Sequence, residues 1–203
     1  QSHLSENLSE IAWVKELVPS ANFYAEAYEK FGMLSGSTGC IMAHCVHSDE
    51  REMELLKKSG VFIAHSPESN MNVASGVAPV NRYLDYGLSV GLATDVAGGS
   101  HESMFRAMTH SIRSSKLLWR LQDQTVEHVT FDTAFYMATK GGGAFFGKVG
   151  AFEPGYELDV VVLDDTNLDP PQPLSIHERL ERVVYLGDDR NIYSKYVAGE
   201  RLF

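Results

Sequence analysis

The sequence has little cysteine, little proline and no long hydrophobic run. Its 203 residues include two cysteines and seven prolines. The two cysteines, Cys40 and Cys45, are too few for a disulfide-built secreted domain, and their spacing is not that of a CxxC metal motif. We therefore expect reduced thiols and a cytoplasmic location. The longest apolar runs, such as residues 160–163, are far too short to span a bilayer.

Positive charge is also scarce. The 17 Lys and Arg residues against 27 Asp and Glu residues give a formal net charge of −10. Nucleic-acid-binding domains are usually basic, with Lys and Arg clustered on one face, and anionic membrane surfaces attract basic segments. We therefore expect neither a nucleic acid nor a membrane as a partner.

The rest of the composition is that of an ordinary globular protein, with 44% hydrophobic and 22% charged residues. This composition excludes disordered, collagen-like and coiled-coil chains. The length allows one large domain, or a medium domain with a small appendage, but falls short of the roughly 250 residues of a complete (β/α)8 barrel. The chain begins at Gln1, and Gln1-Ser2-His3 is typical of the middle of a protein. We therefore expect a fragment or a processed chain.

Short apolar runs alternate with amphipathic stretches in the first three quarters of the chain. Continuously apolar strands separated by helices indicate a parallel sheet that is covered on both faces. We expect residues 66–78 to form a polar loop. The predicted strands are 40–44, 61–65 and 89–95, and the predicted helices are 7–18, 23–31, 49–59, 79–86, 102–120 and 130–146.

The character of the sequence changes near residue 148. A strand at 158–164, a proline-rich loop, a helix at 175–185 and a hairpin at 192–203 with Gly199-Glu200 as its turn are predicted there. We therefore divide the chain into residues 1–148 and residues 149–203.

Residues suited to metal binding or proton transfer occur at the ends of successive candidate strands: His3 with Glu6, then His44, His65 and Asp95. The carboxyl ends of parallel barrel strands converge on one mouth, where active sites are built. Imidazole and carboxylate groups suit zinc, which lowers the pKa of a bound water towards ~7. Glu6 is the obvious carboxylic acid to deliver a proton to a leaving amine.

Each of these residues also has a structural interpretation. A single His at the end of an apolar run is more often a hydrogen-bonded structural residue, Asp95 can cap the next turn, and Glu6 can be a carboxylate in the first turn of a helix. Four such coincidences in strand order are less expected than one. The pattern therefore favours a hydrolase or a binding site.

Six segments form recognisable motifs: QSHLSEN at 1–7, AHC at 43–45, HSPESN at 65–70, GLATDVAGG at 91–99, GAFEPG at 150–155 and YLGDDRNI at 185–192. These segments resemble the motifs of the amidohydrolase superfamily, in particular its guanine deaminase branch. The resemblance implies part of a (β/α)8 TIM-type metal-dependent hydrolase barrel, strands five to eight, in residues 1–148. It also implies part of a small β-sandwich, with a terminal helix, in residues 149–203.

The same resemblance implies roles for individual residues. His3 and Asp95 correspond to metal ligands, and Asp95 also takes a proton from the attacking water. Glu6 corresponds to the residue that shuttles protons, and His44 to the residue that orients the water or the substrate. The implied reaction is the zinc-dependent hydrolytic deamination of guanine to xanthine and ammonia. His65 and Asn70 either touch this purine substrate or tie down their own loop by local hydrogen bonds.

The chain also departs from the family pattern. It contains no His-x-His motif, which supplies two of the family's metal ligands, and the family's purine-gripping Arg and Gln belong to the half of the barrel before Gln1. A catalytic zinc usually has three protein ligands. We therefore expect this chain alone to bind zinc weakly and to have no turnover. We also expect it to form homo-oligomers or to depend on the missing half, because half a barrel exposes strand edges.

Two alternatives stay open at this point. One is another aminohydrolase of the same superfamily, acting on a related heterocycle such as a methylthioadenosine-type or triazine-type substrate. The other is a non-catalytic interaction module, a short relative that has lost its first half.

Overall fold

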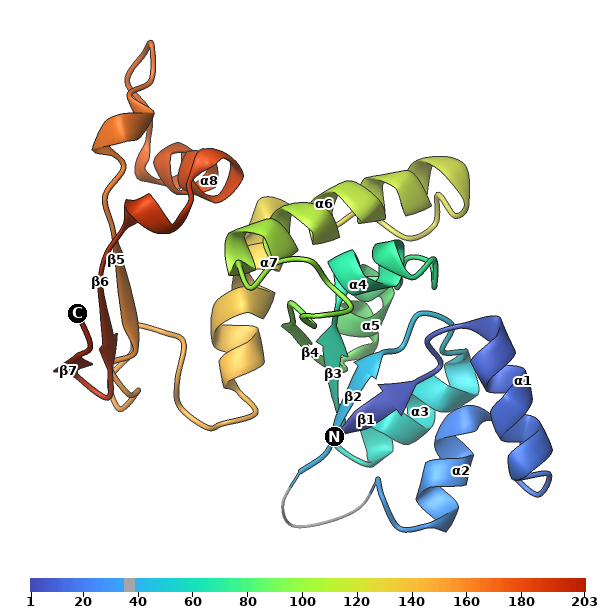
Figure 1. Ribbon diagram of the computed structural model, residues 1–203. Helices are drawn as coiled ribbons and strands as arrows, with labels where there is room; N and C mark the ends of the chain where they lie inside the picture. The colour runs from blue at the N-terminus through green and yellow to red at the C-terminus, as the bar shows by residue number, and fades with distance from the viewer. Residues whose placement is uncertain (35–38) are drawn as a thin grey trace.

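The structure is a computed structural model that describes residues 1–34 and 39–203. Figure 1 shows two parts: a parallel sheet with helices packed around it, and a small antiparallel sheet with one helix. Helix α6 (Met104–Leu121) of the first part contacts α8 (Ile176–Leu186), the helix of the smaller part.

The first part is built on a four-stranded sheet in which all neighbouring strands are parallel. The strands follow the order of the sequence: β1 (Ser2–Leu4), β2 (Ile41–His44), β3 (Phe62–His65) and β4 (Ser89–Leu92). The predicted parallel sheet is therefore confirmed.

One face of this sheet is buried under helices and the other is only partly covered. Met42 and Ile63 are each 1% exposed, whereas their neighbours along β2 and β3 have intermediate exposure. The expectation that both faces are fully covered was therefore wrong. Among the described residues, β1 and β4 pair on one side only, so the arc of strands does not close over its inner face.

Two of the helices of this part, α1 (Leu8–Leu17) and α3 (Glu50–Lys58), begin at a side-chain cap. The side chain of Asn7 accepts a hydrogen bond from the backbone N–H of Glu10 at 2.9 Å, and Asp49 does the same for Glu52 at 2.9 Å. The predicted helices are confirmed as α1 (Leu8–Leu17), α2 (Tyr24–Lys30), α3 (Glu50–Lys58), α5 (Val80–Tyr86) and α6 (Met104–Leu121).

A short helix, α4 (Pro67–Asn72), lies inside the segment predicted to be a polar loop. Pro67 is compatible with a first helical turn, and the backbone N–H of Asn70 donates to the carbonyl of Ser66 at 3.0 Å. The segment has no apolar period from which a helix could be predicted. The buried side chain of Asn70 stabilises it instead through its hydrogen bond to Nδ1 of His44 at 2.9 Å.

The predicted helix at 130–146 is present and changes its pitch. It begins as α7 (Phe131–Tyr136) and continues as a π-helical segment, η1 (Met137–Gly141). This segment packs on β4 at a contact between two glycines. A Cβ atom on Gly91 would lie 2.9 Å from the Cα atom of Gly142, so a side chain at Gly91 would force the two elements apart.

The second part is one three-stranded antiparallel sheet, which corresponds to part of the predicted β-sandwich. Strand β6 (Ile192–Val197) pairs with β5 (Val160–Leu163) and with β7 (Glu200–Arg201). Helix α8 (Ile176–Leu186) lies between β5 and β6, so the helix is not terminal and the chain ends after β7. Short 3-10 turns, η2 (Thr166–Leu168) and η3 (Asp189–Asn191), flank α8.

The turn of the terminal hairpin lies one residue earlier than predicted. Ala198 and Gly199 connect β6 to β7, with φ values of 49° and 80°. A two-residue hairpin turn of this kind needs positive φ at both central positions, and Glu200 instead pairs with Val197.

A hydrophobic core fills the space between the parallel sheet and its helices. Leu4, Met42, Leu56, Ile63 and Tyr83 are among its most buried members. No helix within residues 1–34 and 39–203 is long and apolar enough to cross a membrane.

Candidate active site

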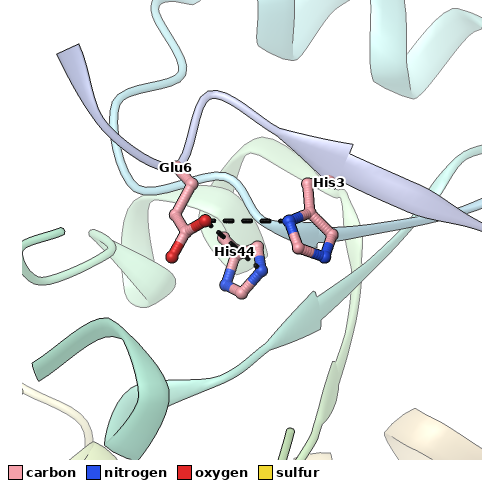
Figure 2. A group of neighbouring side chains, drawn as sticks. All are labelled: His3, Glu6 and His44. Carbon is pink, nitrogen blue, oxygen red and sulfur yellow. Dashed lines mark ion pairs between the residues drawn. The ribbon is translucent and has the colours of Figure 1, made fainter. Parts of the chain in front are cut away.

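Four of the predicted site residues gather at the carboxyl ends of the parallel strands. His3 lies on β1, Glu6 follows it, His44 ends β2, and Asp95 follows β4. The register pairs His3 with Ala43 and Leu4 with His44, which places the ends of β1 and β2 side by side. Figure 2 shows the side chains of His3, Glu6 and His44 turned towards one another.

The distances between these side chains define a compact polar cluster. One carboxylate oxygen of Glu6, Oε2, lies 3.7 Å from Nδ1 of His3 and 3.8 Å from Nε2 of His44. The two imidazole rings meet edge to face with centroids 4.6 Å apart. Asp95 Oδ2 lies 4.0 Å from His44 Nε2. His44 therefore lies between both carboxylates.

The backbone turns sharply where it delivers these residues. Ser5, His44 and Asp95 have φ values of 45°, 73° and 50°. Positive φ is uncommon for residues other than glycine and is often found at functional sites. Because none of the three is a glycine, nothing in the sequence indicated this conformation.

Among the described residues, His44 is hydrogen-bonded through one of its two ring nitrogens. His44 is 1% exposed, and its Nδ1 lies 2.9 Å from the side-chain oxygen of Asn70. An amide oxygen only accepts hydrogen bonds, so Nδ1 carries the proton in this pairing. His44 Nε2 is buried and has no hydrogen-bond partner among the described residues.

His65 and Asn70, the candidate substrate contacts, both have protein partners. His65 is 2% exposed, and its Nε2 lies 3.1 Å from the hydroxyl of Ser111. Burial, together with the nearby His44, lowers the pKa of His65 to about 3, so its imidazole is neutral. Neither contact is local to the loop, and Nδ1 of His65 and Nδ2 of Asn70 are buried without a partner among the described residues, so both alternatives stay open.

The donor atoms fit a zinc ion. The ligand atoms of His3, Glu6 and His44 lie within 4.8 Å of one another, and imidazole nitrogen and carboxylate oxygen are common zinc ligands. His3 and Asp95, the predicted metal ligands, are the more accessible members, with side chains 62% and 35% exposed. Their contacts in this structure are to Glu6 and His44, respectively.

The structure adds one contact to this cluster that the sequence did not reveal. The hydroxyl of Ser75 donates to Oε1 of Glu6 at 2.8 Å. The two residues are far apart in the chain, and serine is common in loops, so no sequence pattern pointed to this pair.

Comparisons with known proteins agree with the fold and with the motifs. The model of the amidohydrolase family matches residues 1–202. The chain is 35% identical over 209 residues to the guanine deaminase of Dictyostelium discoideum, an alignment that covers 100% of this chain and 46% of that protein. It is 32% identical over 202 residues to a 5'-deoxyadenosine deaminase of Methanopyrus kandleri, covering 98% of this chain and 44% of that protein.

A solved structure of a guanine deaminase is also similar to this chain over its whole length. The guanine deaminase from C. acetobutylicum with guanine bound in its active site superposes with a TM-score of 0.94 at 49% identity, covering 100% of this chain and 48% of that one. The chain thus spans about half the length of the relatives it matches.

Proposed function

The chain belongs to the amidohydrolase family, and from this membership we propose that it forms the carboxyl-terminal half of a zinc-dependent enzyme that hydrolyses guanine to xanthine and ammonia. The observation that carries the proposal is the approach of Glu6 and Asp95 to Nε2 of His44, which has no hydrogen-bond partner within residues 1–34 and 39–203. The names of the relatives, guanine deaminases among them, support guanine as the substrate.

In this proposal His3 and Asp95 hold the zinc ion, with further ligands from outside these 203 residues. When bound, zinc lowers the pKa of a coordinated water and makes it a usable nucleophile near neutral pH. The donor chemistry of the two side chains supports their assignment as ligands.

The side chains of this chain then divide the proton transfers. Asp95 accepts a proton from the attacking water. Glu6 carries the two protons of this water, including the one that Asp95 accepts, to the purine ring nitrogen and to the amine. The water oxygen stays bonded to the ring carbon, and the carbon–nitrogen bond breaks as the amine leaves as ammonia. His44 orients the water through Nε2, the nitrogen that its hydrogen bond to Asn70 leaves free. Each role needs a group that approaches the same point, and the distances around His44 support that arrangement.

We also propose that the 203-residue chain by itself binds zinc weakly and does not turn over guanine. Two protein ligands are fewer than the three that catalytic zinc sites usually have. Xanthine production by the purified chain, free of any longer enzyme, would contradict this part of the proposal.

The two free cysteines are in keeping with the cytoplasmic location predicted for the protein.

The test of the proposed reaction is the substitution Glu6→Gln in the natural full-length protein that carries this sequence. Loss of a proton-transfer group is expected to lower kcat for guanine by about 10²- to 10⁴-fold. Glu54→Gln, on the exposed face of α3, is the control and should leave kcat unchanged. An E6Q enzyme with the turnover of the unmodified protein would overturn the proposal.

A second candidate is the deamination of another purine. It is favoured by the similarity to the 5'-deoxyadenosine deaminase, which covers nearly the whole chain. Assays of the full-length protein on guanine, adenosine-type substrates and pterins, with ammonia release as the readout, separate the two. The larger kcat/KM identifies the substrate.

A further inference from the structure

The Ser75–Glu6 contact joins two segments that are 69 residues apart in the sequence. Ser75 follows α4 and is 5% exposed. Its hydroxyl lies beside a carboxylate oxygen that has no other side-chain hydrogen bond among the described residues. The contact is therefore shielded from most of the solvent. A hydrogen bond to a charged group contributes more in such a shielded place than at the surface.

The backbone of Ser75 is held on both sides. Its N–H donates to the carbonyl of Asn70 at 2.8 Å, and its own carbonyl lies 2.9 Å from Nε2 of His47, which donates to it. Ala74 and Gly76 on either side have φ values of 58° and 125°. The hydroxyl is thus presented from a fixed backbone position rather than from a freely rotating loop.

The two carboxylate oxygens of Glu6 have different neighbours. Oε1 accepts from Ser75, whereas Oε2 faces both His3 and His44. The terminal torsion of a glutamate side chain is broad, so an unrestrained carboxylate would rotate between many orientations. The Ser75 hydroxyl selects the orientation in which Oε2 points to the imidazoles.

Resting on the proposed function, we infer that Ser75 is a positioning residue for proton transfer: it holds Oε1 of Glu6, so that Oε2 reaches the reacting groups. His47 supports it by fixing the backbone of Ser75. Ser75 does not touch the substrate in this role and acts only through Glu6.

The kinetic test uses Ser75→Ala in the natural full-length protein. Without the Ser75 hydroxyl the Glu6 carboxylate is expected to be displaced, which should lower kcat by about 10- to 100-fold and leave KM for guanine nearly unchanged. Ser114→Ala is the matched control, because Ser114 is also a buried serine, 2% exposed, and donates only within α6, to the Ser111 carbonyl at 3.3 Å. Unchanged kcat in S75A would overturn the inference.

A double-mutant cycle separates positioning from a general structural effect. If Ser75 acts through Glu6, then S75A added to E6Q causes no further loss of kcat. If the two losses multiply, Ser75 acts elsewhere and the inference is wrong.

Crystal structures of the unmodified protein and of S75A test the inference without reference to activity. The expected result is that Glu6 Oε2 faces His44 in the unmodified protein and turns away in S75A. A Glu6 side chain that stays in place in S75A would overturn the inference. An enzyme that lacks guanine deamination but shows the Glu6 displacement would instead contradict the proposed function alone.

Discussion

His44 depends on a single side chain for its protonation pattern. Asn70, itself 1% exposed, holds Nδ1 of His44 with its side-chain oxygen. A ligand or a base needs a defined tautomer, and the partner of the other ring nitrogen sets that tautomer. Asn70 therefore fixes the orientation of the His44 ring within the cluster.

We predict that Asn70→Ala lowers kcat of the full-length protein by about 10-fold or more, because His44 loses its orienting partner. The comparison is with Asn81→Ala, because Asn81 binds the carbonyls of Glu127 and His128 at the surface, each at 3.0 Å. Steady-state kinetics on both variants provides the measurement. Equal kcat values for N70A and N81A would show that Asn70 does not control His44.

The sequence pointed to the His and carboxylate residues at the strand ends and to Asn70, but not to Ser75, which contacts Glu6. The order of the apolar runs places four residues at the ends of candidate strands, so they could be predicted from the sequence: His3, Glu6, His44 and Asp95. Ser75 could not be found, because its contact with Glu6 depends on how a distant loop folds back.

At the scale of elements, α4 and the residues after it organise the whole cluster. Asn70 binds His44 and Ser75 binds Glu6. Asn72 donates from its side chain to the carbonyl of Gly98 at 2.7 Å, within the loop that follows Asp95. One short segment thus supports the strand ends that carry Glu6, His44 and Asp95. A segment stabilised by such distant polar contacts has little local signature, which explains why it was predicted to be a loop.

The contact between β4 and the π-helical segment η1 gives a prediction at this scale. Gly91→Ala would place a Cβ atom 2.9 Å from the Cα atom of Gly142, and backbone atoms cannot yield as a flexible side chain can. We expect the free energy of unfolding to fall by about 1–3 kcal/mol. Chemical denaturation measures the change.

Ser89→Ala is the control for this variant, because Ser89 is an exposed residue of the same strand. It should change the free energy of unfolding by less than about 0.5 kcal/mol. If G91A were as stable as S89A, the close approach of the two glycines would not limit the packing.

At the scale of the whole molecule, the parallel sheet has two open edges. Among the described residues, β1 pairs only with β2, and β4 pairs only with β3. Unpaired strand edges are templates for association with further strands. This exposure was expected from the resemblance to a (β/α)8 barrel taken together with the length, since 203 residues are fewer than a complete barrel needs.

We therefore predict that the purified 203-residue chain self-associates. Sedimentation velocity over a range of concentrations is expected to show species larger than the 22.5 kDa monomer, increasing with concentration. Adding the polypeptide that precedes these residues in the full-length protein should suppress the larger species. A well-folded monomer at every concentration would show that the open edges are tolerated.

The strand order of the parallel sheet also has a consequence for biosynthesis. Each strand pairs with the strand that follows it in the sequence, so the sheet can grow as the ribosome releases the chain. Translation runs from the amino end at about 5–20 residues per second. Glu6 therefore emerges several seconds before Ser75 and Asp95. During that interval the nascent chain contains Glu6 without the partners that surround it in the fold, and the cluster is complete only once β4 and its loop have been made.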